Sequence, residues 1–151
     1  MTTFASEETI PGTPQEIWEY ATDITRHPEW MAVTDVRIVR GDGMQAGTRG
    51  RERMRFGPFR WDIEFEVAEA VPGRRIVWKA IDGAPFDLAV SLDLAPVTGE
   101  WTKATYAADI RLRGPWRVLA PMVAIDGKSG PERELRRLKA RFEDRTSGGH
   151  P

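Results

Sequence analysis

The chain has 151 residues, a formal net charge of −1, two histidines and no cysteine. Its length suits a single domain, and its charge provides no overall attraction to nucleic acid or to an anionic membrane. The composition excludes disulfides and thiolate metal sites and argues against a histidine metal site. We find neither a signal-peptide pattern nor an apolar stretch of the roughly 20 residues that a membrane helix needs. We therefore expect a cytoplasmic protein without a metal or redox cofactor.

The first 31 residues predict a strand followed by short helices. Residues 2–10 suit a strand, and Thr13 suits a helix N-cap because proline follows it and a capping-box glutamate stands three residues later. A second helical piece over 24–26 is expected to end at His27, because a residue before proline is disfavoured in the helical region. Trp30 then falls on a loop, and we expect His27 to be structural or at the surface.

Six runs of alternating residues follow, and glycine- or proline-containing turns separate them. They cover residues 33–40, 48–56, 59–70, 74–82, 86–95 and 101–112. Strands this close in sequence form an antiparallel meander. Together with the first strand they predict a six- or seven-stranded sheet.

Charge fixes the register of the predicted sheet, because a slip by one residue would turn every side chain to the other face. A turn at Gly57-Pro58 gives one face the pairs Arg49–Glu66, Arg51–Glu64 and Arg53–Asp62. It gives the other face the pairs Met54–Trp61, Glu52–Ile63 and Gly50–Phe65. The arginines at 49–55 suggest a nucleic-acid stripe, but their acidic partners lie directly across the strand. We therefore expect a paired, solvated outer face and no nucleic-acid partner.

The same choice of faces extends through the remaining strands. It predicts the pairs Glu66–Lys79, Phe65–Ala80, Val67–Trp78, Arg75–Asp93 and Trp78–Val90. For the last hairpin it predicts Asp93–Lys103, Val90–Tyr106 and Phe86–Ile110. Asp87 and Asp109 would then face each other on the outer side, where we expect them to be solvated rather than to form an acid/base pair.

The apolar inner face needs a cover, and the sequence from Pro115 to about Asp144 is the long helical candidate. Its apolar stripe consists of Leu119, Met122, Val123, Leu135, Leu138 and Phe142. Pro131 within IDGKSGP predicts a kink or a break, with Ser129 near a second N-cap. Alternatively, the segment Asp126 to Pro131 forms a mobile gate over the interior. Residues 145–151 are expected to be a disordered tail.

These residues carry a family resemblance. The order of strand, TPQEIWEYATDITRHPEW, meander with a Gly-rich turn before TRGRERM, LRGPWRVLAPM and ERELRRLKARFED resembles the SRPBCC superfamily of START-like, helix-grip proteins. It is most similar to the polyketide cyclase/dehydrase and lipid-transport-like branch, and the likeness spans about residues 4–143. The resemblance implies an α+β helix-grip fold, in which the curved sheet wraps around a long C-terminal helix. It also implies an apolar pocket between sheet and helix that binds a small molecule.

The residues of each strand that point to the inner face are the ones expected to line this implied pocket. The expected lining consists of Val36, Met54, Trp61, Ile63, Phe65, Trp78, Val90, Met122 and Val123. Glu52 is the one carboxylate on this face of its hairpin, and apolar surroundings favour the protonated form of a carboxyl group. Glu52 is therefore a candidate for general acid/base catalysis, such as removal of a proton beside a carbonyl group. Tyr106 could polarise that carbonyl. Alternatively, Glu52 is hydrated or only binds ligand, and Tyr106 is a core residue.

Residues 1–144 are thus predicted to form one domain that binds a hydrophobic or aromatic molecule. The leading hypothesis is a polyketide cyclase/dehydrase-like enzyme. The main alternative is a non-catalytic carrier of a lipid-like ligand, and a third hypothesis is a partner-binding module that uses the charged outer face. An open edge strand leaves room for a homodimer, although no residue pattern demands one.

Overall fold

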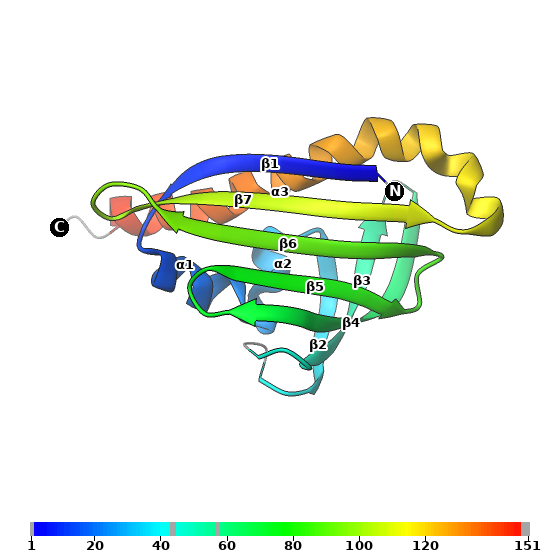
Figure 1. Cartoon of the computed structure of the whole chain (residues 1–151), viewed down its shortest axis with the longest axis horizontal. Coiled ribbons are helices and arrows are strands. Elements are labelled where there is room, and N and C mark those ends of the chain that lie inside the picture. The colour runs from blue at the N-terminus through cyan, green and yellow to red at the C-terminus, as the bar shows by residue number, and fades with distance from the viewer. Residues whose placement is uncertain (1, 43–44, 57, 149–151) are drawn as a thin grey trace.

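The computed structural model describes residues 2–42, 45–56 and 58–148. One curved antiparallel sheet dominates it, with strand order β1-β7-β6-β5-β4-β3-β2 (Figure 1). The strands are β1 (Thr2–Pro11), β2 (Val33–Arg40), β3 (Arg49–Phe56), β4 (Phe59–Val71), β5 (Arg75–Asp82), β6 (Phe86–Pro96) and β7 (Trp101–Leu112). The helices are α1 (Pro14–Ala21), η1 (Ile24–Arg26), α2 (His27–Trp30), η2 (Gly114–Leu119) and α3 (Ala120–Gly148). The predicted α+β helix-grip fold is confirmed.

The segment between β1 and β2 differs from the prediction at one point. The Thr13 hydroxyl accepts a hydrogen bond from the Glu16 N–H at 3.2 Å, as expected of an N-cap. Helix η1 covers residues 24–26 and ends at His27, as predicted, but His27 also begins helix α2, and Trp30 lies on that helix rather than on a loop. The reason is that proline in the first turn of a helix loses no hydrogen bond, because the first N–H groups have no partner within the helix. The single turn of α2 buries both His27 and Trp30.

The predicted register holds from β3 to the start of β6. Every predicted pair between β3 and β4 is present, as are those between β4 and β5 and between β5 and β6. On the outer face, ion pairs join Arg49 to Glu66 at 3.0 Å, Arg51 to Glu64 at 3.5 Å, Arg53 to Asp62 at 3.2 Å and Arg75 to Asp93 at 2.6 Å. The other face of the sheet, which carries the apolar pairs, therefore points to the interior.

The predicted register of the last hairpin is wrong by two residues. Asp93 pairs with Thr105, Val90 with Ala108 and Phe86 with Leu112. Strand β6 extends one residue beyond the predicted end at 95, because Pro96 pairs with Thr102. The Val97 N–H donates to the Trp101 carbonyl at 3.0 Å, so the turn is tighter and lies later than expected. Gly99 supports this turn with a φ of 62°. A shift of two keeps every residue on its predicted face.

The same shift separates the two outer carboxylates that were predicted to face each other. Asp87 lies opposite Arg111 and forms an ion pair with Arg113 at 3.5 Å. Asp109 accepts a hydrogen bond from the Thr3 hydroxyl at 2.5 Å. Lys103, predicted to pair with Asp93, forms an ion pair with Glu7 at 3.3 Å instead.

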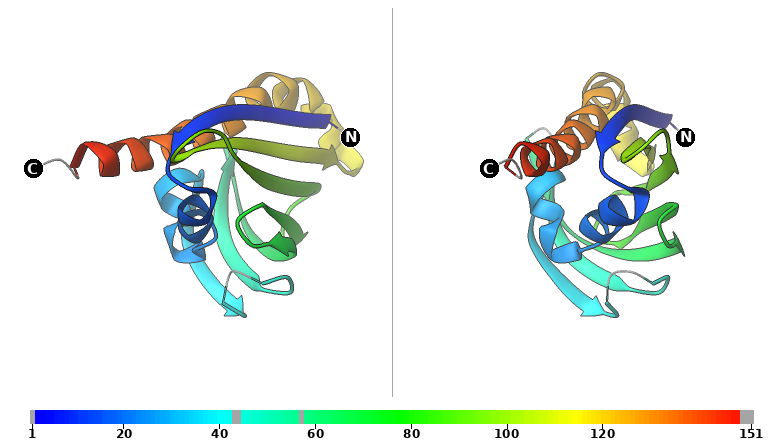
Figure 2. Two further views of the ribbon diagram at one scale, coloured as in Figure 1. Left: turned by 60° about the vertical axis from the view of Figure 1, so that its left-hand side comes forward. Right: turned by 90° about the vertical axis from the view of Figure 1, so that its left-hand side faces the viewer.

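Helix α3 covers the concave face of the sheet. It packs against β1, β7 and α2, and Figure 2 shows it along the opening between β1 and the segment around α2. Its buried residues Leu135, Leu138 and Phe142 join one core with Ile17 and Trp30. The predicted break at Pro131 is absent, because α3 is continuous from Ala120 to Gly148. The helix follows a curved path instead (Figure 1), as expected where proline removes one backbone hydrogen bond.

The helix also extends beyond the predicted boundary at Asp144, because α3 reaches Gly148. The last three residues of the expected tail lie outside the described residues. Ser129 lies within α3 and therefore begins no second helix. Gly130 and Pro131 line the interior cavity described below, and a gate formed by this segment remains a prediction.

Candidate functional site

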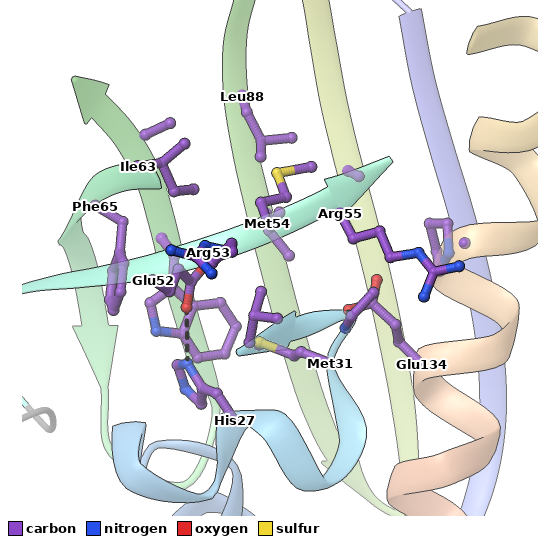
Figure 3. Close-up of a pocket in the computed structure, with 18 of the residues that line it drawn as sticks. His27, Met31, Glu52, Arg53, Met54, Arg55, Ile63, Phe65, Leu88 and Glu134 are labelled. Carbon is purple, nitrogen blue, oxygen red and sulfur yellow. Dashed lines mark hydrogen bonds and ion pairs between the residues drawn. The ribbon is translucent and has the colours of Figure 1, made fainter. Parts of the chain in front are cut away.

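A cavity of about 770 Å³ lies between the inner face of the sheet and the middle of α3. Strands β3 to β7 form its floor, and α2 and the start of β2 form one wall. Figure 3 shows the side chains of Ile63, Phe65, Met54 and Leu88 around this space, with His27 and Glu134 facing it from the helices. The volume lies within the range of roughly 300 to 1,000 Å³ that is typical of small-molecule sites.

Seven of the sequence-predicted site residues line this cavity. They are Glu52, Met54, Ile63, Phe65, Trp78, Val90 and Tyr106. Four others stand outside its lining: Val36, Trp61, Met122 and Val123. Trp61 stacks on Phe59 at a ring-centroid distance of 5.6 Å and meets Phe86 and Trp116 edge-on. This aromatic cluster fills the end of the interior beside η2, so the open space lies further along the sheet.

The remaining three residues have other surroundings. Val36 is partly buried and packs against the core. Val123 is buried and Met122 is half-buried in the first turn of α3. That turn precedes the stretch Gly130–Arg137, where α3 meets the cavity.

A β-bulge in β2 lies opposite Glu52. Between the pairs Thr34–Arg53 and Arg37–Arg51, two residues of β2 oppose the single residue Glu52 on β3. One of the two, Asp35, has a φ of 51°, which is uncommon for a residue other than glycine. Bulges bend a strand and redirect side chains, and they are frequent next to active sites.

Glu52 meets His27 inside the cavity. The Oε2 atom of Glu52 lies 3.7 Å from Nδ1 of His27, and their side chains are 11% and 1% exposed. Both nitrogens of the His27 ring and Glu52 Oε2 are buried without a hydrogen-bond partner in the described part of the chain. Leaving such groups unpaired is costly, and buried polar atoms without partners are rare in folded proteins. A ligand that hydrogen-bonds to this pair would remove the cost.

Aromatic rings hold the imidazole of His27 in place. Its centroid lies 5.4 Å from the Trp78 ring, 6.0 Å from Phe65 and 6.2 Å from Trp30. The dashed line in Figure 3 joins His27 to Glu52 across the cavity wall. An imidazole and a carboxylate at this separation can share or relay a proton with little movement.

A second polar pair lies across the cavity. Tyr106 lines the cavity from β7 and Glu134 lines it from α3, and the Glu134 carboxyl accepts a hydrogen bond from the Ala32 N–H at 3.0 Å. Burial raises the pKa of Glu134 from its usual 4.5 to about 7, and the Glu52 charge adds to the rise. The Ala32 hydrogen bond and the charges of Arg137 and Arg133 oppose it. Burial, together with Glu134 and Glu52, raises the pKa of Tyr106 well above 10.0, which keeps its hydroxyl a proton donor.

Comparison with known proteins identifies the family. Residues 1–143 match the family described as polyketide cyclase / dehydrase and lipid transport. The chain belongs to this family. No curated protein matches the chain in sequence.

Solved structures of this fold include a protein from Thermus thermophilus, with a TM-score of 0.79, 20% identity and coverage of 95% of this chain and 98% of that chain. A START superfamily protein from Mycobacterium smegmatis gives a TM-score of 0.79 at 16% identity, covering 94% and 97%. The Zhui aromatase/cyclase from Streptomyces sp. R1128 gives 0.78 at 12% identity, covering 99% of both chains. Identities this low establish the fold alone. The family match confirms the predicted polyketide cyclase/dehydrase and lipid-transport branch, and the solved structures confirm the predicted START-like fold.

Two polar residues of the site were not predicted, although both had a signal in the sequence. His27 precedes Trp30 by three residues, a spacing that puts two side chains on one face of a helical turn. Glu134 stands four residues before Leu138 and three after Pro131, on the edge of the apolar stripe of α3. A carboxylate at such a position faces the interior unless the helix is rotated.

Within the described residues, no group of three or more His, Cys, Asp or Glu side chains is arranged to hold a metal ion. Among those same residues, no helix combines the length and the apolar character needed to cross a membrane.

The raised pKa of Glu134 predicts a pH-dependent stability. Between about pH 4.5 and 7 the folded protein holds a proton that the unfolded chain has released, so the free energy of unfolding falls as pH rises through this window. Each tenfold change in proton affinity between the folded and unfolded states is worth about 1.4 kcal/mol of unfolding free energy. Because Glu134 is only half-buried, solvent screens part of this effect, and we expect the free energy of unfolding to fall by about 2 kcal/mol across this window. Denaturant unfolding of wild type and Glu134→Gln should show this loss in the wild type alone.

A matched control lies on the same helix. Glu132 pairs with Arg136 at 3.6 Å, its side chain 41% exposed, and Glu132→Gln should keep the wild-type pH dependence. The assignment is contradicted if Glu134→Gln follows the wild-type curve.

Proposed function

We propose that the cavity binds an apolar or aromatic small molecule and catalyses acid/base chemistry of the kind that cyclises or dehydrates a polyketide. The observation that carries this proposal is the buried His27–Glu52 pair, whose facing atoms have no hydrogen-bond partner in the described chain. A purely apolar carrier would have no need of such a pair. The family description and the aromatase/cyclase of the same fold support this proposal.

The chemistry divides between the two polar pairs. Glu52, with His27 beside it, takes a proton from the carbon next to a substrate carbonyl. The resulting enolate attacks a second carbonyl carbon, so that a carbon–carbon bond forms and the carbonyl oxygen receives a proton. Tyr106 and Glu134 are suited to hydrogen-bond to that oxygen and to supply the proton, because a carboxyl group with a pKa of about 7 exchanges protons readily at neutral pH. For dehydration, Glu52 first returns its proton through solvent and the acid is reprotonated. Glu52 then removes a second proton from the same carbon, a carbon–carbon double bond forms, and the new hydroxyl group leaves as water with the proton that the acid supplies. No oxidant is required.

The second candidate is a carrier that binds a lipid-like ligand without chemistry. The apolar floor of the cavity and the lipid-transport part of the family description favour it. Both candidates need the same cavity, and they differ only in whether the bound molecule is converted. A cytoplasmic location and a homodimer formed through an open edge strand remain part of the proposal.

A fluorescence titration tests binding for both candidates. Trp78 lines the cavity, whereas Trp101 is half-exposed at the start of β7. We expect saturable quenching by one class in a panel of fatty acids, sterols and aromatic polyketides. Trp78→Phe should lose most of this signal, and Trp101→Phe should keep it. Failure of the entire panel to change the emission would contradict the proposal.

A further inference from the structure

The cavity lining is far more basic than the chain as a whole. Six lining residues are arginine or lysine and two are glutamate, although the formal net charge of the chain is −1. Part of this positive charge is engaged elsewhere. Arg53 pairs with Asp35 at 3.3 Å and with Asp62 at 3.2 Å, and Arg137 donates to a backbone carbonyl at 3.5 Å. Lys79 lies across from Glu66 in the outer-face register.

Three arginines of the lining have no acidic partner of this kind. Arg55, Arg60 and Arg133 form no ion pair with any residue in the described ranges. Arg55 and Arg60 lie directly opposite each other across β3 and β4, whereas each of the earlier arginines of β3 has a carboxylate at that place. Like charges directly opposite destabilise a sheet. The pairing of arginine with carboxylate on this face thus ends at Arg53 and Asp62.

The third arginine lines the cavity from the helix. Arg133 precedes Glu134 in α3, and its charge lowers the pKa of that carboxyl group. Figure 3 shows Arg55 extending from β3 towards α3, on the side of the cavity where Glu134 lies. The three arginines thus lie at the rim of the cavity on two sides, Arg55 and Arg60 on the hairpin of β3 and β4 and Arg133 on α3. Guanidinium groups bind carboxylate and phosphate oxygens through paired hydrogen bonds.

We infer that the ligand is an amphipathic anion, with an apolar body in the cavity and a carboxylate or phosphate group held by Arg55, Arg60 and Arg133. This inference rests on the proposed function and narrows its substrate class. The anion offsets the repulsion between Arg55 and Arg60. It also orients the ligand, because the charged end stays at the mouth while the opposite end reaches His27 and Glu52.

Three probes that share one alkyl chain test the inference: decanoate, decyl phosphate and decanol. Each is titrated below its critical micelle concentration against wild type, Arg55→Gln and the double variant Arg55→Gln/Arg133→Gln. We expect at least one anion to bind about tenfold more tightly than decanol to wild type, and the tighter anion identifies the headgroup. This preference should fall in Arg55→Gln and vanish in the double variant, while decanol binds all three proteins alike.

Arg49→Gln is the control, because Arg49 lies on the same strand but pairs with Glu66 on the outer face. The inference is overturned if decanol binds wild type as tightly as both anions, or if Arg49→Gln weakens anion binding as much as Arg55→Gln. If decanol binds and neither anion does, the inference of an anionic headgroup is wrong, whereas the proposed function is not contradicted. Binding of none of the three would count against the proposed function itself.

Discussion

Glu52→Gln is expected to lower the rate of cyclisation or dehydration of a bound polyketide by about 100- to 10,000-fold, the usual contribution of a general base. Glutamine keeps the shape of the side chain and loses the proton acceptor that faces His27 at 3.7 Å. Affinity for the same compound should change little, since the apolar lining is untouched. The measurement is a turnover assay, followed by product chromatography, on compounds that pass the fluorescence titration.

Glu66→Gln serves as the matched control for that assay. Glu66 stands on β4 and binds Arg49 on the outer face, away from the cavity. Its variant should retain the full rate. Equal rates in wild type and Glu52→Gln would show that Glu52 is not the base, and binding without turnover in wild type would favour the carrier.

Much of the fold could be predicted from the pattern of charged and apolar residues along neighbouring strands. Three of the four arginines of β3 meet three carboxylates of β4 in one register only, and that register set the inner face of the sheet. Between β6 and β7 the only predicted charge pair was Asp93–Lys103, and the expected register was wrong by two residues because Asp93 binds Arg75 and Lys103 binds Glu7 instead. A backbone hydrogen bond between Val97 and Trp101 closes the turn there, and a backbone hydrogen bond leaves no pattern in the side chains.

The interior could be predicted only in part, because its empty and filled regions depend on how large side chains pack. Trp61 and Trp78 both point inward, yet Trp61 belongs to an aromatic cluster and Trp78 lines the cavity. The alternation of side chains along a strand shows which face a residue lies on, but it does not show which side chains pack around that residue in the interior.

Glu52 was predictable as an inward carboxylate, but its partner was not. His27 lies 25 positions earlier in the numbering and reaches Glu52 only because α2 is a helical turn. Proline after His27 favoured the opposite expectation, since it usually ends a helix but is also tolerated at the start of one. Glu134 comes from α3, at the far end of the chain, and meets Tyr106 only after the sheet has curved.

The central claim is that ligand occupies this cavity, and the most direct test is the affinity of Ala108→Phe for the compound that quenches wild type best. Ala108 lines the cavity on β7, while its neighbour Ala107 points to the outer face and does not line it. A phenylalanine at position 108 competes with ligand for the same space. Displacing it should cost about 1 to 3 kcal/mol, or about 10- to 100-fold in affinity. The account predicts this loss in Ala108→Phe and none in Ala107→Phe, with circular dichroism unchanged in both. Equal affinity of the two variants would place the ligand elsewhere and contradict the account.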